Sequence, residues 1–345
     1  MGLEFKSRVT LAHGAGGRET SEIVRRLFLE RFRFTRVSGG VGLPELDDAA
    51  SIPVGGGRHI VVTTDSYTVN PIFFPGGDIG KLAATGTIND LAVMGAIPVA
   101  VLDSIVVEEG FPLEHLDRIV NSIKDTLESE NVALIGGDFK VMPRGSIDKI
   151  VITMTGIGIL YTNRILLDSN VKPGDKIIVT GSIGEHGATI LALQSGIDVE
   201  SSSLRSDCQP LTRIMRRILD IGGVHAAKDP TRGGLAMALN EFAKKSNVGI
   251  IVWEDRIPIR DEVKMYSEML GVDPLTLACE GRALLSVSPD KAYEVLEELR
   301  SIGCSDAEII GEAVDDYKGM VILKTVSGGL RVLEEPMGEI VPRIC

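Results

Sequence analysis

The sequence predicts an α/β (α+β) protein with two domains. Short apolar runs typical of buried strands alternate with helix-like stretches along the 345 residues, and this alternation favours sheets covered by helices. The length is sufficient for two hydrophobic cores. A polar stretch at 163–175, which ends in Lys172-Pro173-Gly174-Asp175, is typical of a domain junction. The expected units are an N-terminal Gly-rich segment and helix at 1–40, domains at 41–160 and 161–334, and a tail at 335–345.

The first half of the chain opens with a glycine-rich segment at 13–17, followed by a helix-like stretch at 19–33. A second glycine-rich turn at 38–42 leads into Leu46-Asp47-Asp48-Ala49-Ala50. Pro98 separates a helical pattern from the strand-like run after it, because proline interrupts a regular helix. In order, we expect a strand at 60–65, a helix at 80–94, a strand at 99–107, a helix at 112–131, a buried strand at 133–135 that ends at Gly136-Gly137-Asp138, and a strand at 149–158.

The second half repeats the alternation after the polar junction. In order, we expect a strand at 176–180, helices at 185–195, 211–219 and 234–245, a strand at 249–253, a strand at 283–288, a helix at 290–301 and a strand at 320–324.

Composition excludes several classes of protein. The net charge is −12, and the chain has no basic cluster long enough to follow a phosphate backbone, which argues against nucleic acid as the main partner. No apolar run has the length of a membrane span, and residues 1–18 contain no hydrophobic signal core, so we expect a cytoplasmic protein. The cysteines never form a CxxC pair, which argues against a disulfide framework and an all-cysteine zinc site. They are Cys208, Cys279, Cys304 and Cys345.

Five segments place an acidic residue at the end of an apolar strand or beside a glycine turn, where α/β proteins commonly assemble sites. Any one of these acids is more simply explained as a cap or a turn residue, but the whole set is not. Carboxylates from separate elements repel one another unless a cation lies between them, and Mg²⁺ suits both oxygen ligands and nucleotide phosphates. The segments are Asp47-Asp48, Asp65, Asn89-Asp90, Gly136-Gly137-Asp138 and Asp229-Pro230-Thr231-Arg232-Gly233-Gly234.

The common phosphate-binding loops do not match this sequence. The nearest candidate, at 75–82, has Pro75 where a P-loop has its first glycine and Leu82 where it has a magnesium-binding hydroxyl. Gly156-Ile157-Gly158 is followed by Ile159-Leu160-Tyr161, which does not complete a dinucleotide fingerprint. If ATP binds, it binds a different architecture.

Two further residues are candidates for catalysis. Glu280, in Cys279-Glu280-Gly281, follows a short helical pattern and precedes a strand. A carboxylate in such apolar company can have a raised pKa and act as a base, although a surface turn explains the pattern equally well. Lys140 follows Asp138 by two residues and suits the neutralisation of phosphate, although a solvated lysine is the simpler interpretation.

The chain ends in Cys345, on an arm with little to pack against. Chain ends are usually poorly ordered unless they are tied down, and an extended arm from 336 to 345 spans roughly 30 Å. The thiol is either incidental or a mobile carrier of a reacting group, and the tail alone does not decide between them.

Taken together, these segments resemble the AIR synthetase-related (PurM-like) family of ATP enzymes, and within it the HypE family of hydrogenase maturation proteins. The resemblance spans essentially the whole chain. The Asp-Asp-Ala-Ala and Asn-Asp-Leu-Ala pieces are shared with thiamine-phosphate kinases and selenophosphate synthetases, whereas the Phe-Phe-Pro-Gly-Gly-Asp stretch and the terminal Cys single out HypE. The matching segments are 13–17, 46–50, 63–67, 73–81, 89–92, 136–138 and 342–345.

The resemblance implies a fold and an activity. The expected fold has an N-terminal mixed sheet with helices that forms a homodimer, a C-terminal α/β sandwich and a mobile tail. A HypF-like carbamoyltransferase would load a carbamoyl group on Cys345, ATP would drive its dehydration to a thiocyanate, and the cyano group would pass to iron on a HypC–HypD scaffold complex. Alternatives are another ATP enzyme of this fold, such as a small-molecule kinase or amidine-forming ligase, and a non-catalytic nucleotide-binding scaffold.

The resemblance also assigns roles to residues. Cys345 would carry the substrate, Glu280 would be the base and Lys140 would stabilise negative charge. Mg²⁺ and the triphosphate would be held by Asp48, Asp65, Asp90, Asp138 and Asp229. The remaining ATP-binding residues would be Lys81, Asn89, Gly136 and Gly137.

Overall fold

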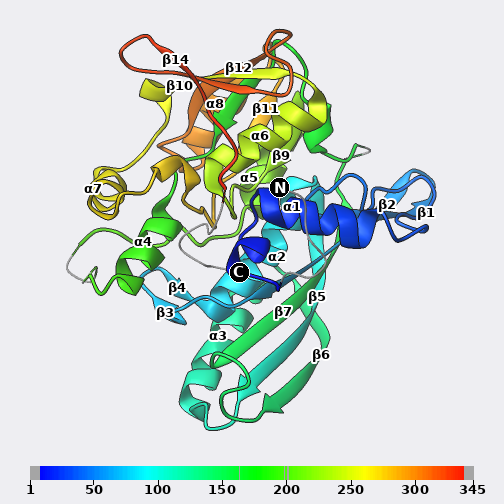
Figure 1. Ribbon diagram of the computed structural model, residues 1–345. Helices are drawn as coiled ribbons and strands as arrows, with labels where there is room; N and C mark the ends of the chain where they lie inside the picture. Colours follow the sequence, from blue (N-terminus) through cyan, green and yellow to red (C-terminus); the bar gives the residue numbers. More distant parts are fainter. Residues whose placement is uncertain (1–7, 163, 198, 200–201, 338–345) are drawn as a thin grey trace.

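The computed structural model describes residues 8–162, 164–197, 199 and 202–337. Two mixed sheets, each accompanied by helices, lie one above the other in Figure 1. The predicted fold class is therefore confirmed. Within the described residues, no helix is long and apolar enough to cross a membrane.

The N-terminal sheet has five strands in the order β1-β2-β7-β5-β6. Every neighbouring pair is antiparallel except β5 and β6, which are parallel and are joined through helix α3. A helical crossover of this kind is the usual way to join parallel strands. The strands are β1 (Ala50–Gly55), β2 (Arg58–Tyr67), β5 (Ala96–Glu108), β6 (Ala133–Met142) and β7 (Ile150–Leu160).

Helix α2 (Ile79–Val93) is the central helix of the molecule, and all of its residues except Lys81 are buried. Asp78 caps its first turn by accepting hydrogen bonds from the amides of Gly80 (2.9 Å) and Lys81 (3.0 Å). One side of α2 packs on the N-terminal sheet and on the amphipathic helix α3 (Leu113–Ser129). It also packs on α5 and β9, which belong to the C-terminal domain, so the two domains share one continuous packed region around α2.

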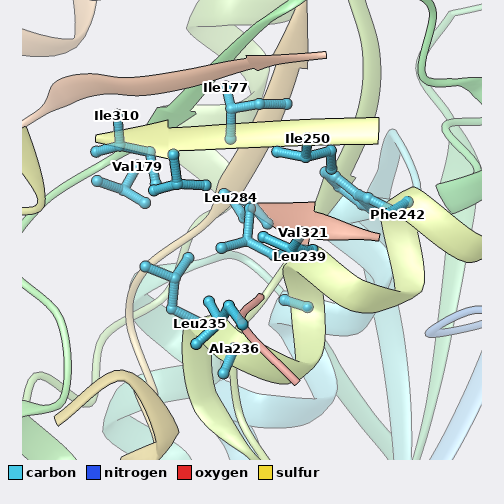
Figure 2. Close-up of a cluster of buried hydrophobic side chains, with 14 of the residues drawn as sticks. Ile177, Val179, Leu235, Ala236, Leu239, Phe242, Ile250, Leu284, Ile310 and Val321 are labelled. Atoms are coloured by element: carbon cyan, nitrogen blue, oxygen red, sulfur yellow. The ribbon is translucent and has the colours of Figure 1, made fainter. Parts of the chain in front are cut away.

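The C-terminal sheet has seven strands in the order β14-β13-β10-β12-β8-β11-β9. Its largest core cluster lies between this sheet and helix α6 (Gly234–Ser246), where Leu235, Leu239 and Phe242 meet strand residues such as Ile250 (Figure 2). The strands are β8 (Lys176–Val179), β9 (Val224–Lys228), β10 (Gly249–Trp253), β11 (Leu284–Val287), β12 (Glu308–Val314), β13 (Val321–Lys324) and β14 (Leu330–Val332). The other helices are α4 (Glu185–Gln194), α5 (Thr212–Ile221), α7 (Asp261–Leu270) and α8 (Ala292–Ser301).

Three features differ from the sequence-based expectation. The expected helix at 19–33 consists of α1 (Arg18–Val24) followed by a wider π-helical turn, Arg25–Leu29. The expected strand at 133–135 continues to Met142, because its partner β5 is 13 residues long and pairing resumes after a bulge at Val101/Leu102. The strands and α-helices that the pattern did not predict are β1, β9, α7, β12, β14 and the two-residue strands β3 (Phe73–Phe74) and β4 (Gly77–Asp78).

The expectation of a buried strand at 133–135 is wrong, because strand β6 is an unusually exposed edge of the N-terminal sheet. In the part of the chain that the structure describes, it pairs only with β5. Nearly every one of its residues is exposed, including Leu134, Ile135, Phe139 and Val141, which are all more than half exposed. A long apolar edge strand offers unpaired backbone groups to another chain, and proteins usually cover such edges.

Candidate active site

Four of the five predicted acidic residues line one cavity between the two domains. Asp48 precedes β1, Asp65 lies on β2, Asp90 lies near the end of α2, and Asp229 directly follows β9. The cavity has a volume of about 500 Å³. Because α2 packs on both domains, it brings Asp90 to the place where the end of β9 faces the N-terminal sheet.

Burial and mutual repulsion make these carboxylates hard to ionise. The pKa of Asp229 is raised to about 8, first by burial and then by the nearby Asp48. Burial is also the largest cause for Asp48, whose pKa is raised to about 6, and for Asp90, whose pKa is raised well above its usual range. The pKa of Asp65 is raised by burial and opposed by Arg232. Acids in such an arrangement favour a cation between them.

The cavity suits a magnesium nucleotide. Asp48 Oδ2 is buried, and no group among the described residues donates a hydrogen bond to it, so this oxygen is available to a cation. Asp90 Oδ2 accepts a hydrogen bond from Thr63 (2.7 Å), which orients its carboxylate. The described residues contain no preformed group of three or more His, Cys, Asp or Glu side chains that could hold a metal ion. Mg²⁺ is usually held by one or two carboxylates together with nucleotide phosphates and water.

Two glycine-rich segments border the same cavity. The predicted N-terminal segment contributes Gly16, where a Cβ atom would lie 2.5 Å from Arg232 Cβ, so only glycine fits this approach. Gly233 and Gly234 both have positive φ and begin helix α6 at the cavity wall. The first turn of a helix presents free amides and a partial positive charge, which favours phosphate.

An ion network that sequence reasoning missed lies at the cavity wall. Lys228, the last residue of β9, is buried and pairs with Asp48 (2.5 Å), Glu241 (3.1 Å) and Asp168 (3.3 Å). Lys245 pairs with Asp168 (2.7 Å) as well. Lys228 directly precedes Asp229 in the sequence, which was the one available indication, but its partners come from three separate segments of the chain.

Glu280 does not line the acidic cavity, but it is close enough to Asp229 and Asp65 for their charges to act on it. Its side chain is buried, and its pKa is raised well above the usual range by burial and then by Asp229, Asp207 and Asp65. The residue sits in the segment between the short helical turn Pro274–Thr276 and β11, as the sequence pattern predicts. A buried carboxylate with a raised pKa, close to a cavity lined by acids, is a candidate general base.

The remaining predicted residues do not line this cavity. Asp138 and Lys140 are exposed on β6, and Asp138 lines a separate hollow of about 550 Å³ with Gly136 and Gly137. Lys81 donates a hydrogen bond to the Gly76 carbonyl (2.9 Å). Asn89 is fully buried and outside the cavity lining. One chain alone therefore does not bring Asp138 and Lys140 to the four acids. Cys345 lies outside the described residues.

Each half of the chain matches a domain of a known protein family. Residues 46–160 match the model of the AIR synthase related protein N-terminal domain, and residues 172–324 match that of its C-terminal domain. The chain is 40% identical to the carbamoyl dehydratase HypE of Rhodobacter capsulatus, with 98% of each chain covered. It is also 40% identical to HypE of Escherichia coli, over 98% of this chain and all of that one.

Solved structures agree with the sequence comparisons. A crystal structure of a HypE–HypF complex matches with a TM-score of 0.84 and 37% identity, covering 91% of this chain and 99% of that one. A crystal structure of HypE in complex with ATP matches with a TM-score of 0.80 and 36% identity, covering 98% of this chain and all of that one.

Proposed function

Since this chain belongs to the HypE family of carbamoyl dehydratases, within the AIR synthase related proteins, we propose that its substrate is a carbamoyl group carried on the sulfur of Cys345. The reaction converts this group to a thiocyanate in an ATP-dependent dehydration. It serves the maturation of [NiFe] hydrogenase, as the source of the cyanide ligands of the iron.

The proposed reaction removes the carbamoyl oxygen as phosphate. The carboxamide oxygen attacks the γ-phosphorus of ATP, the bond to ADP breaks, and the oxygen becomes part of a phosphate ester. Two N–H protons then leave the nitrogen and the C–O bond breaks, which releases phosphate and leaves S–C≡N. An amide oxygen is a poor leaving group, and phosphorylation makes it a good one. The oxygen of the eliminated water therefore ends in the inorganic phosphate.

Glu280 is the proposed base for the N–H protons. Its buried position beside Asp229 and Asp65 raises its affinity for a proton, which suits a base more than an ordinary solvated carboxylate does. Tethering the carbamoyl group to the chain supports the same reaction, because an intramolecular reactant has a high effective concentration.

Mg²⁺ is the proposed metal, held with the triphosphate by Asp48, Asp65, Asp90, Asp138 and Asp229. When bound, it would neutralise phosphate charge and favour transfer of the γ-phosphoryl group. Four of these acids share the cavity, and the orphaned Asp48 oxygen supports the proposal.

Asp138 and Lys140 require a second copy of the chain in this proposal. The exposed apolar edge of β6 supports a homodimer in which the edges of two N-terminal sheets meet. A partner chain would then bring Asp138, Lys140 and the neighbouring glycines toward the cavity, where Lys140 would stabilise negative charge on the reacting group.

Loading and delivery of the group involve other proteins in the proposed cycle. The solved complex of a related HypE with HypF supports a HypF-like carbamoyltransferase as the loading partner. A HypC–HypD scaffold that holds iron is the proposed acceptor, and the cytoplasm is the proposed compartment.

The convergence of four acids on the inter-domain cavity, with the buried Glu280 close enough to feel the charges of Asp229 and Asp65, carries the proposal. It is tested by intact-protein mass spectrometry after incubation with the carbamoylating partner and Mg-ATP. We expect a carbamoyl adduct that loses one water only when ATP is present. Cys345→Ala should bind ATP normally and form no adduct. An adduct that persists unchanged with Mg-ATP would contradict the dehydratase.

A further inference from the structure

Glu280 is held through its main chain by the carboxylate of Asp207. Asp207 Oδ1 accepts a hydrogen bond from the amide of Glu280 (3.2 Å), and Oδ2 accepts one from the amide of Gly281 (3.2 Å). Oδ1 also accepts from the amide of His186 at the start of α4 (3.2 Å). Three backbone donors from two segments thus converge on one buried side chain.

The side chain of Asn89 holds Glu280 at its carbonyl group. Asn89 on α2 donates from Nδ2 to the Glu280 carbonyl (3.2 Å) and to the Gln209 carbonyl (3.3 Å). Its Oδ1 accepts from the amide of Leu211 (2.8 Å). Both Nδ2 hydrogens and the carbonyl oxygen of Asn89 are therefore engaged with backbone, although its motif predicted an ATP contact.

The charge of Asp207 has a nearby counter-charge. Arg282 Nε lies 3.7 Å from Asp207 Oδ2, and the same guanidinium bonds Glu185 at 2.6 Å. A buried carboxylate that accepts several N–H bonds and faces a guanidinium holds its partners in a defined geometry. Loss of such an acceptor would leave buried amides unpaired.

The two side chains that bond the backbone of Glu280, Asp207 and Asn89, are called its anchors, and they connect it to both sides of the cavity. Asn89 directly precedes Asp90, which lines the cavity, so Glu280 and an acid of the proposed nucleotide site are fixed to the same turn of α2. Asp207 directly follows Ser206, whose amide donates to the Pro75 carbonyl (2.9 Å) in the loop that leads into α2. Asn89 therefore contacts Glu280 across the domain boundary, and Asp207 adjoins a contact, between Ser206 and Pro75, that also crosses it.

We propose that Asp207 and Asn89 are positioning residues for the dehydration step, because together they fix the backbone of Glu280 from both of its peptide groups. This inference rests on the proposed function, with Glu280 as the base. Neither residue lines the cavity, so neither is expected to bind the nucleotide. A small displacement of a reacting group costs on the order of 100-fold in rate.

The test compares single-turnover dehydration in full-length chains loaded on Cys345 by the carbamoylating partner. Asp207→Asn and Asn89→Asp should each slow ATP-dependent loss of water by about 100-fold. The KM for ATP should stay at the wild-type value. The matched control is Asp175→Asn, because Asp175 is also a buried acid with backbone and side-chain hydrogen bonds but lies outside both anchors. This control should dehydrate at the wild-type rate even where its melting temperature falls.

A double-mutant cycle separates positioning from a general structural effect. If Asp207 acts through Glu280, adding Asp207→Asn to Glu280→Gln should cause no further loss of rate. An equal slowing in both backgrounds, or a wild-type rate in Asp207→Asn and Asn89→Asp, would overturn the inference. If Asp207→Asn does not fold, the same double-mutant cycle is measured with Asn89→Asp and Glu280→Gln. Failure of the proposed function has a different signature, namely no dehydration in the wild type or full activity in Glu280→Gln.

Discussion

Lys228 Nζ lies 2.5 Å from Asp48 Oδ1, so a lysine of the C-terminal domain neutralises an acid of the N-terminal domain at the cavity wall. The same ammonium contacts Asp168 and Glu241. This contact makes the cavity and the domain junction parts of one charged network.

Replacing Lys228 should destabilise the fold strongly. Lys228→Met leaves Asp48, Asp168 and Glu241 without this counter-charge, and removal of one partner from a buried pair costs about 3–5 kcal/mol. Urea denaturation should show a lower midpoint with an unchanged slope. Lys318→Met is the control, because Lys318 is exposed and pairs only locally with Asp315, so it should change the midpoint little. Equal urea midpoints for Lys228→Met and Lys318→Met would contradict a stabilising role for the ion network around Lys228.

Asp229→Asn should separate ligand binding from stability. The variant removes a carboxylate that repels its neighbours, so the ligand-free protein should be at least as stable as the wild type. Mg-ATP at about 100 times its Kd should stabilise the wild type by about 2.7 kcal/mol and the variant much less. Thermal unfolding with and without Mg-ATP measures both effects. Asp220→Asn, which alters an exposed acid bonded to Tyr161, should keep the full ligand-induced shift.

The sequence predicted the convergence of the acids better than it predicted their partners. Asp48, which precedes β1, and Asp229, which follows β9, lie at strand ends as their patterns predict, and such ends meet where two sheets pack. Asp65 lies within β2 and Asp90 within helix α2, so the packing of these elements brings them to the same cavity. The pairing of Lys228 with Asp48 joins residues 180 positions apart. It depends on how the domains dock, which no local pattern records.

The roles of Asn89 and strand β6 illustrate the same limit. Asn89 belongs to a motif that suggested a ligand contact, yet its amide is engaged by three backbone groups of the other domain. For strand β6, the sequence predicts a short buried strand that ends at Gly136-Gly137-Asp138, whereas the observed strand is exposed and continues to Met142. Its actual length is set by pairing with β5, which extends to Glu108.

His186 should make the stability of the protein fall at acidic pH. Burial lowers its pKa to about 4, and this outweighs the opposing effect of Asp207, the charged group nearest to it. Between pH 6.5 and pH 4 the unfolded chain binds a proton on this histidine that the folded chain does not, so stability falls as pH decreases. The slope approaches about 1.4 kcal/mol per pH unit. The free energy of unfolding measured from pH 7 to pH 4 should fall less steeply for His186→Gln than for the wild type and for His13→Gln. Parallel curves would contradict the prediction.

An acidic residue on the exposed edge of β6 should separate the proposed dimer. Phe139 is 54% exposed in one chain, so Phe139→Asp should leave the fold of each chain intact while placing a charge at the proposed junction. Light scattering should report a monomer with unchanged circular dichroism. Phe34→Asp changes an even more exposed phenylalanine outside β6 and should keep the wild-type mass. A dimeric Phe139→Asp would contradict the use of this edge.

Mixing two inactive variants tests whether two chains share one active site. Lys140 and Glu280 lie on different domains, and Lys140 is exposed on β6 away from the acidic cavity of its own chain. If Lys140 acts across the junction, a hybrid of Lys140→Ala and Glu280→Gln contains one site in which both residues are intact. Dehydration should therefore return when the two variants are unfolded together and refolded, and native mass spectrometry verifies that hybrids form. A mixture of Lys140→Ala with the Lys140→Ala/Glu280→Gln double variant should stay inactive, because each of its sites lacks Lys140. Inactive hybrids of the first pair would show instead that Lys140 and Glu280 serve the same site from one chain, since every such site would then lack one of the two residues.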